Sequence, residues 1–331
     1  MNENNKVCVA LIYGGRGRES EVSVRGKNHI LPLFDQNTYH VIEIFIDKKG
    51  RWLIGGSEVF PHRGGFYCPE SGELHKVDAA IPLLHGDFGE DGRVQGALDC
   101  VDIPYVGCDT LAGAVCRDKV FVKMIAEKLS IPTLPYRLIL GREGIDYAVR
   151  VLEESLSYPM FIKPARLGSS LGASAAETRR QLISALTLAF TMVDRVIVEP
   201  CLTHKRELEC GYFSVKSKEL FTNPGEILHK GTYGYDEKYL SGEVGLAIRA
   251  DVSDEIRDAV REYSRRLVRA LGIRHLARVD FFLSDDGRLY FNEVNTMPGF
   301  THSSLYAKML EAEGIPKSEI FPRLIESIIG G

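Results

Sequence analysis

The chain has 331 residues, of which 44% are hydrophobic and 26% are charged, a balance typical of a folded protein rather than a disordered one. Its formal net charge of -4 gives no basic excess, so the composition favours neither a nucleic-acid-binding nor a membrane-surface protein. The seven cysteines include no C-x-x-C pair, and no segment is apolar for long enough to span a bilayer. We therefore expect a cytoplasmic, soluble protein of two or three domains without a zinc or iron–sulfur site.

Strand-like and helix-like segments alternate in the first third of the chain. The predicted strands are Val7–Ile12, Val41–Ile46, Trp52–Ile54, Val77–Leu84 and Ile103–Val106, and the predicted helices are Glu21–Leu33 and Glu90–Cys100. Such alternation indicates a parallel sheet with crossover helices.

The pattern changes near Arg117, where a helix to Leu129 is predicted. The later predicted helices are Glu177–Phe190 and Ser253–Leu271, the later strands are Met160–Lys163, Arg195–Glu199 and Glu207–Val215, and two helices close the chain. Arg278–Leu283 and Leu289–Val294 are predicted to form a hairpin, because Asp285-Asp286-Gly287 between them is a turn sequence.

The first glycine-rich segment, Gly14–Ser20, follows the first predicted strand. Gly15-Arg16-Gly17 begins like a dinucleotide-binding loop, but the third glycine of G-x-G-x-x-G is missing, so a plain strand-to-helix turn is an equal alternative. The chain also has no G-x-x-x-x-G-K-[ST] loop. A bound nucleotide must therefore be held in another way.

A second loop combines glycine with hydroxyl groups. Lys163 ends a predicted strand, and Gly168–Gly172, which includes Ser169 and Ser170, follows it. Backbone N–H groups of such a loop can surround phosphate oxygens while the lysine supplies a positive charge. A surface loop without a ligand is the alternative.

Four polar residues lie on the predicted C-terminal hairpin. Arg278 and Asp280 share one face of a strand, and Glu293 and Asn295 share a face of its partner. Carboxylate and amide oxygens suit Mg²⁺, which proteins often share with substrate phosphates. The alternative is a cross-strand ion pair beside the arginine.

Two further loops contain candidate groups. The Pro298-Gly299 turn precedes a helix whose N-cap is Thr301 or Ser303, and its backbone N–H groups can hold a carboxylate or an oxyanion. The polar loop around Lys238 and Tyr239 has the composition of a lid, although many such loops have no function. His85 at a strand end is more often structural than catalytic.

Taken in order, these segments resemble D-alanine–D-alanine ligases over nearly the whole chain. The most specific pieces are H-G-x-x-G-E-D-G at His85–Gly92, K-P-A-R-L-G-S-S-L-G from Lys163, and N-E-V-N-T-M-P-G-F-T from Asn292. The resemblance implies an α/β chain with the ATP-grasp fold. It also implies three domains, with a parallel-sheet domain at 1–116, a central lid domain at 117–208 and a catalytic domain at 209–331, the last two enclosing ATP.

The resemblance also implies a role for each matching position. The residues implied to contact ATP are Lys119, Lys163, Ser169, Ser170, Glu199, Leu202, Glu207, Lys238 and Asn292. The residues implied to hold two Mg²⁺ ions, with Mn²⁺ as a substitute, are Asp280, Glu293 and Asn295. The residues implied to bind the two D-alanines or their tetrahedral intermediate are Glu19, His85, Arg278, Gly299, Ser304 and Leu305. Glu19, Ser169 and Tyr239 are implied to form a hydrogen-bonded triad that ties the lid loop to the substrate.

The sequence departs from the family pattern at a few positions. Pro200 follows Glu199 where many members have lysine, and the stretch before Glu207 is one residue longer. Arg16-Gly17-Arg18 stands before Glu19 in place of the usual Thr-Ser-Ala or Lys-Ser-Ala.

The resemblance implies ligation of two D-alanines through an acyl phosphate, which serves peptidoglycan precursor synthesis, and the family is commonly dimeric. Lys238-Tyr239 favours D-alanine over D-serine or D-lactate as the second substrate. The alternatives are another ATP-grasp carboxylate–amine ligase, an NAD-dependent oxidoreductase that uses the first glycine loop, and a catalytically inactive nucleotide-binding regulator.

Overall fold

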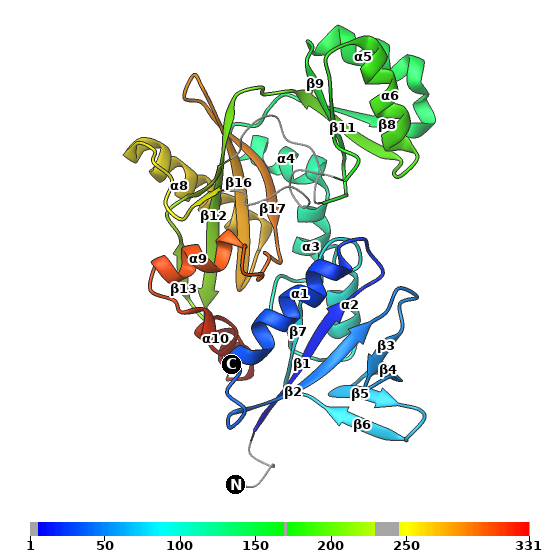
Figure 1. Ribbon diagram of the computed structural model, residues 1–331, viewed down its shortest axis with the longest axis vertical. Coiled ribbons are helices and arrows are strands. Elements are labelled where there is room, and N and C mark those ends of the chain that lie inside the picture. Colours follow the sequence, from blue (N-terminus) through cyan, green and yellow to red (C-terminus); the bar gives the residue numbers. More distant parts are fainter. Residues whose placement is uncertain (1–5, 169–170, 229–244, 331) are drawn as a thin grey trace.

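The computed structural model describes residues 6–168, 171–228 and 245–330, and in these ranges the strands form three sheets (Figure 1). The first sheet, made of β1 to β7, lies at the bottom of Figure 1, the second, made of β8 to β11, lies at the upper right, and the third lies at the upper left. The predicted boundaries after residues 116 and 208 fall inside α3 (Thr110–Arg117) and β12 (Lys205–Val215). The division into three domains with those limits stays a prediction.

The first sheet has the strand order β6-β5-β4-β3-β2-β1-β7. Its strands are β1 (Val7–Gly14), β2 (Tyr39–Ile46), β3 (Trp52–Ile54), β4 (Ser57–His62), β5 (Gly65–Cys68), β6 (Glu73–Lys76) and β7 (Ala79–Pro82). The predicted parallel pairing is confirmed for β1 with β2 and β7. The strands from β3 to β6 instead form an antiparallel meander that was not predicted beyond β3. Ile103–Val106 is not a strand and contributes only a single bridge from Tyr105 to Ala80.

Both faces of β1 are covered, which explains why its sequence is a continuous apolar run. Val9 and Leu11 pack into the cluster that contains α1 (Ser20–Ile30) and α10 (Lys317–Ile329) residues. Ala10 and Ile12 point to the opposite face, where α2 (Arg93–Asp99) packs. The sheet therefore presents the carboxyl ends of β1 and β7 at one fixed edge, where the Gly14 and His85 loops begin.

The second sheet has the order β10-β9-β11-β8. Its elements are β8 (Arg137–Leu140), α5 (Ile145–Ser155), β9 (Met160–Pro164), β10 (Ser174–Ala176), α6 (Arg179–Phe190) and β11 (Arg195–Pro200). Apolar residues from α5, α6 and one face of the sheet form one buried cluster, so both helices cover the same face. Thr178 begins α6 with a capping box that includes Gln181, which sets the helix start two residues after the predicted one. The uncovered face of β9 and β11 turns toward the third sheet.

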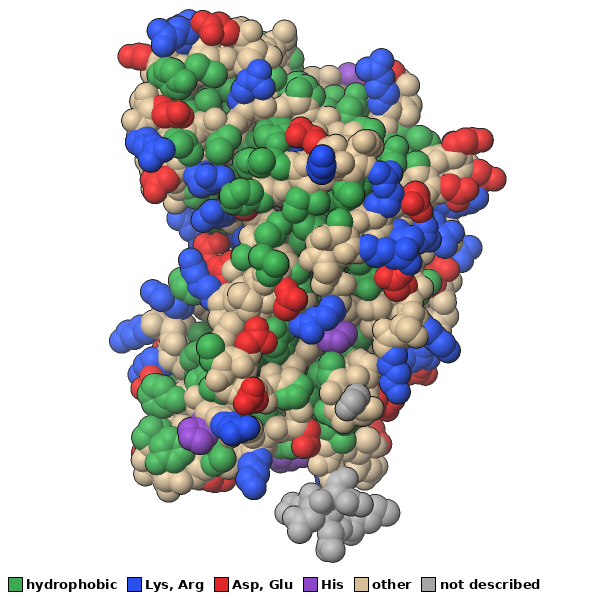
Figure 2. Space-filling model, turned by 180° about the vertical axis from the view of Figure 1, so that it is seen from behind, with side chains coloured by type: hydrophobic (Ala, Val, Ile, Leu, Met, Phe, Trp, Pro, Cys, Tyr) green, Lys and Arg blue, Asp and Glu red, His purple; other side chains and the backbone are tan. Residues whose placement is uncertain are grey.

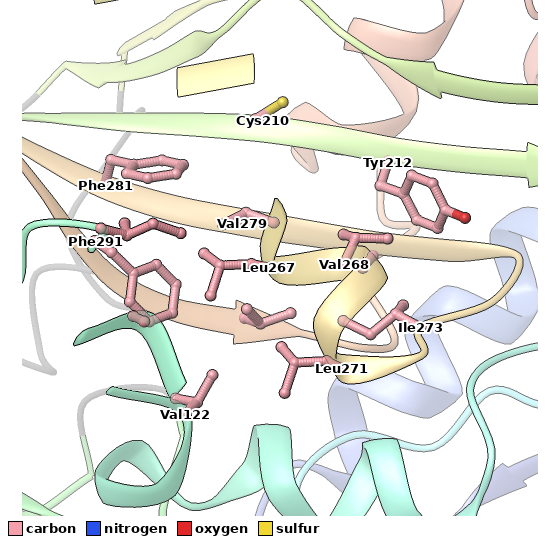
Figure 3. Packing of buried hydrophobic residues seen from close by; sticks show 14 of the residues in the cluster. Val122, Cys210, Tyr212, Leu267, Val268, Leu271, Ile273, Val279, Phe281 and Phe291 are labelled. Carbon is pink, nitrogen blue, oxygen red and sulfur yellow. The ribbon is translucent and has the colours of Figure 1, made fainter. Parts of the chain in front are cut away.

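The third sheet has the order β15-β14-β12-β16-β17, and β13 pairs with β12 off this path. Its strands are β12, β13 (Lys218–Phe221), β14 (Gly225–Leu228), β15 (Gly245–Ala247), β16 (Leu276–Ser284) and β17 (Leu289–Asn295). The predicted hairpin is confirmed as β16 and β17, with a register shift between Asp280 and Phe281. Figure 3 shows Leu267, Val268 and Leu271 of α8 (Asp254–Leu271) packed toward this sheet, beside Phe281 and Phe291. This core fixes the hairpin, so its opposite face can carry polar groups.

The α-helices of the described residues not yet given are α4 (Lys119–Lys128) and α9 (Leu305–Ala312), and short 3-10 helices cover Leu31–Leu33 and Gly141–Glu143. The predicted helix to Leu129 corresponds to α4, and α3 before it was not predicted. Asp118 ends α3 and caps the N-terminus of α4 by accepting a hydrogen bond from Val120 N. This break between two helices directs Lys119 toward the second and third sheets.

Candidate active site

A cavity of about 700 Å³ opens between the second and third sheets. β9 and β11 line one side, and β12, β14, β16 and β17 line the other. Nine of the predicted site residues lie on its wall: Lys119, Lys163, Glu199, Leu202, Glu207, Arg278, Asp280, Asn292 and Glu293. Gly168, the loop residue next to Ser169, lines it as well. The shared location of these residues, which come from both halves of the chain, is the first geometric support for one binding site.

Three carboxylates stand side by side across the floor of the cavity. Glu209 of β12 is opposite Asp280 of β16, and Asp280 is opposite Glu293 of β17. Residues in register on adjacent strands have Cβ atoms about 4.5–5.5 Å apart, so the carboxylates share one face. Glu209 was not predicted as a site residue, although its alternation with Glu207 on one strand face was a usable signal.

Arg278 holds this row of carboxylates together. Its guanidinium donates to both oxygens of Asp280 at 2.7 Å, and its Nε lies 3.2 Å from Oε1 of Glu209. Asn295 Nδ2 donates to Asp280 Oδ2 at 3.0 Å. Burial alone would lower the pKa of Arg278, but Asp280 and Glu209 hold the pKa well above its ordinary value. The ion pair that was the alternative to a metal site therefore exists, and it brings the predicted metal ligands together.

A β-bulge in β17 places two consecutive side chains at the cavity. Asp280 pairs with Glu293 and Phe281 pairs with Phe291, so Asn292 is the extra residue. Its Oδ1 accepts a hydrogen bond from Lys163 Nζ at 3.1 Å. In regular strand geometry, Asn292 and Glu293 would point to opposite faces.

Lys119 begins α4 and crosses to the carboxylate row. Its Nζ lies 3.2 Å from Oε2 of Glu293 and donates to Leu167 O at 2.8 Å. Leu167 belongs to the loop that follows β9, so this one ammonium group connects the loop to the third sheet. A cation here can pass from a carboxylate to a phosphate oxygen without leaving the cavity.

Two lysines share the buried carboxylate of Glu199. Lys163 Nζ lies 2.7 Å from Oε2, and Lys123 Nζ lies 2.6 Å from Oε1. Burial would raise the pKa of Glu199, yet the two lysines lower it to about 2. Lys123 was missed from the sequence, although it stands four residues after Lys119 and so shares its face of the helix.

Glu19 lies where the first sheet meets the loop after β9. Its Oε2 is 3.7 Å from an Arg117 nitrogen. A Cβ placed on Gly168 would lie 3.2 Å from Glu19 Oε1, so the loop approaches this carboxylate closely. His85 is buried nearby, and its pKa is lowered by burial and by Arg278 against the opposing effect of Glu19. The His85 ring therefore lies within electrostatic range of both Glu19, predicted to bind the first D-alanine, and Arg278, predicted to stabilise the oxyanion.

Glu90, in the H-G-x-x-G-E-D-G segment, connects the loop at Gly86 to Arg117. Its Oε2 accepts from Gly86 N at 2.7 Å and lies 3.5 Å from Arg117. Arg117 in turn reaches Asp87 at 3.2 Å. Neither Glu90 nor Arg117 was given a role from sequence, because only the fold shows that they meet.

Glu90 also gives a pH prediction. Burial first, and then Glu19, raise its pKa from 4.5 to about 7, against the lowering effect of Arg117. Between those pH values the folded chain keeps a proton that the unfolded chain loses, so this group's contribution to stability falls as pH rises from about 4.5 to 7. In thermal unfolding at pH 5 to 8, Glu90→Gln is expected to gain Tm relative to wild type as pH increases. A difference in Tm that stays constant across this range would contradict the assignment.

The turn before α9 places Gly299 beside Ser304. Ser304 Oγ accepts from Thr301 N at 3.0 Å, and a Cβ on Gly299 would lie 2.9 Å from that oxygen. The helix N-cap is Ser304, so the predicted caps Thr301 and Ser303 are wrong. The Leu305 side chain is buried, which leaves its backbone N–H at the helix start as the group available to a carboxylate.

The remaining predicted residues divide into two groups. Leu202 and Glu207 line the cavity, and Glu207 Oε1 lies 3.2 Å from Lys205 Nζ. Ser169, Ser170, Lys238 and Tyr239 lie outside the described residues. The predicted Glu19–Ser169–Tyr239 triad therefore stays a prediction.

The oxygens of Asp280, Glu293 and Asn295 fit a divalent metal in chemistry. They are hard ligands in register on adjacent strands, and Arg278 and Lys119 now balance their charge. Among the residues that the structure describes, no group of three or more His, Cys, Asp or Glu side chains is arranged for a metal. A metal here would therefore need the Asn295 amide and oxygens from its ligand or water.

The surface and helices add two observations. Figure 2 shows acidic and basic side chains intermingled over the face drawn, without a stripe of one sign. Within residues 6–168, 171–228 and 245–330, no helix has both the length and the apolar character to cross a bilayer.

Comparison with known proteins gives a consistent result. Residues 125–329 match the family model described as D-ala D-ala ligase C-terminus, and residues 8–108 match D-ala D-ala ligase N-terminus. D-alanine--D-alanine ligases from Solibacter usitatus and Deinococcus radiodurans are 40% and 38% identical to this chain, over 97% and 96% of it and 95% and 97% of their own length.

Two solved structures are similar over the full chain. The Vibrio cholerae D-alanyl-alanine synthetase A has a TM-score of 0.90 at 30% identity and covers 99% of both chains. The VanG D-Ala:D-Ser ligase from Enterococcus faecalis has a TM-score of 0.86 at 30% identity and covers 98% of this chain and 99% of its own.

Proposed function

The chain belongs to the D-alanine–D-alanine ligase family, and from that premise we propose that it joins two D-alanine molecules with the consumption of ATP. The single observation that carries this proposal is the cavity in which Lys119, Lys163, Arg278 and the carboxylate row converge. An oxidoreductase that uses the first glycine loop does not account for that convergence.

ATP is proposed to occupy the cavity along its length. Glu199 and Leu202 would face the base, Glu207 the ribose, and Lys119 and Lys163 the phosphates. The Lys119 ammonium group is paired with Glu293, and that of Lys163 contacts Glu199 and Asn292. Phosphoryl transfer depends mainly on positioning and charge neutralisation, which these groups supply.

Two Mg²⁺ ions are proposed to bind Asp280, Glu293 and Asn295, with Mn²⁺ as a substitute. When bound, such ions neutralise phosphate charge and orient the terminal phosphate. The protein's own contribution is to fix the ligands on two hydrogen-bonded strands and to provide Arg278 and Lys119 as counter-charges.

The reaction is proposed in two steps. The γ-phosphoryl group passes to the carboxylate of the first D-alanine, whose ammonium is held by Glu19 beside Arg117. The amine of the second D-alanine, with its carboxylate at the Ser304–Leu305 helix start, then attacks the acyl phosphate, and phosphate leaves. Arg278 and the Gly299 N–H are proposed to stabilise the oxyanion of the tetrahedral intermediate.

Phosphate release from ATP with a panel of D- and L-amino acids tests the proposal. We expect release with D-alanine alone, a D-Ala-D-Ala product by mass spectrometry, and no release with L-alanine. D-serine and D-lactate are included beside D-alanine in competition, since a D-Ala:D-Ser ligase shares the fold. Preferential formation of a mixed product would correct the second substrate, and no D-alanine-dependent release would reject the function.

A cytoplasmic location and a homodimer are further parts of the proposal. A single species of twice the chain mass in analytical ultracentrifugation is the expected result for the dimer.

A further inference from the structure

A lysine that does not reach the cavity is joined to one that does. The side chain of Lys123 is 1% exposed, as is that of Glu199, while Lys163 is 11% exposed and lines the cavity. Glu199 lies between them, with one oxygen on each ammonium group. Lys123 Nζ also lies 3.4 Å from Phe291 O, next to the β17 bulge.

Lys123, Glu199 and Lys163 form a trio whose net charge differs from that of an ordinary ion pair. Two ammonium groups face a single carboxylate, so one positive charge remains unbalanced within the trio. If Glu199 met Lys163 alone, the buried pair would be neutral, and a phosphate would have to compete with the carboxylate for Lys163. Such competition is strong in a buried site, where charges are poorly screened.

The pKa shifts of Glu199 and Lys123 support this charge balance. Glu199 stays ionised although it is buried, because Lys123 and Lys163 oppose the effect of burial on its pKa. Burial lowers the pKa of Lys123, and Glu199 is the main opposing influence. Glu199 and Lys123 therefore favour each other's charged form.

We propose that Lys123 is a positioning residue for nucleotide binding: it neutralises Glu199 and so leaves the charge of Lys163 available to a polyphosphate in the cavity. The proposal rests on the proposed ATP site. It assigns the effect to phosphate recognition rather than to base recognition, because Lys163 is the cation of the trio that lines the cavity, where it donates to Asn292.

The test compares the affinities for ATP and AMP by isothermal titration calorimetry, without D-alanine. The ratio of the Kd for AMP to the Kd for ATP isolates the contribution of the outer phosphates from any change in binding of the base. Lys123→Met is expected to reduce this ratio about tenfold, the scale of one charge-assisted hydrogen bond. Lys128→Met, at an exposed position of the same helix, is the control and should leave the ratio unchanged.

A double variant separates charge balance from a purely structural role. In Lys123→Met with Glu199→Gln, no carboxylate of the trio is left to compete with a phosphate for Lys163, so the ratio should return to within about threefold of wild type. Glu199→Gln alone should keep the ratio at or above the wild-type value, and this variant tests the idea even if Lys123→Met does not fold. Tm is measured for each variant.

Three outcomes would each overturn the inference: a ratio unchanged in Lys123→Met, a ratio that stays low in the double variant, or a ratio that falls in Glu199→Gln. Wild-type protein that binds neither ATP nor AMP would instead reject the proposed function. The two failures are thus distinguishable in one experiment.

Discussion

Arg278→Ala is expected to lower kcat about 10²–10³-fold, the cost of removing one oxyanion donor in other enzymes. The reason is geometric: Arg278 is fixed by both oxygens of Asp280 and by Glu209, so its guanidinium needs no rearrangement to meet developing charge. Steady-state phosphate release at saturating ATP and D-alanine measures the effect.

The control for this prediction is Arg288→Ala on the turn of the same hairpin, where the side chain is 73% exposed. It should retain wild-type kcat. Because Arg278→Ala also removes a cation from the carboxylate row, its Tm and its Mg²⁺ dependence are measured alongside. A folded Arg278→Ala variant with wild-type turnover would remove this residue from the mechanism.

Asp280→Asn is expected to reduce kcat by several orders of magnitude, because a metal bound at the proposed site would contribute several kcal/mol of charge stabilisation and each 1.36 kcal/mol is tenfold in rate. Asp280 lies at the centre of the carboxylate row and also orients Arg278. One substitution therefore weakens both the proposed metal site and the positioning of Arg278. Mn²⁺ binding, followed by electron paramagnetic resonance, should weaken in parallel with activity.

The comparison variant is Asp286→Asn, which removes an acidic group from the exposed hairpin turn. It should leave Mn²⁺ binding and kcat unchanged. Normal Mn²⁺ affinity in Asp280→Asn, with activity lost, would show that Asp280 acts through Arg278 rather than through a metal.

Local sequence patterns were sufficient to predict the elements that are buried or that end at a clear turn. The apolar run of β1, the amphipathic α8 and the Asp-Asp-Gly turn of the β16–β17 hairpin each follow from residues close in sequence. The short strands β4 to β6 escaped prediction, because they are only four to six residues long and their place in the sheet depends on pairing with their neighbours.

The candidate site also contains some residues that local patterns predict and others that only the fold brings together. Two-residue alternation on one hairpin was enough to predict that Arg278, Asp280, Glu293 and Asn295 share a face. Asn292 joins them only because the bulge adds a residue to β17, and no local pattern marks that register shift. The adenine-side and phosphate-side positions rested on resemblance to a family.

The sequence by itself determined the fold class, the hairpin with its polar face and the family to which the chain belongs, because each depends on local periodicity or on motifs in a fixed order. The tertiary structure alone decided which charges meet: Lys123 with Glu199, Glu90 with Arg117, and Glu209 with Arg278. These pairs join residues far apart in the chain. Burial raises the pKa of Glu90 and lowers that of Lys123, whereas neighbouring carboxylates raise the pKa of Arg117 and Arg278 against the effect of burial. Such contacts arise from packing between sheets and helices, which sequence periodicity does not specify.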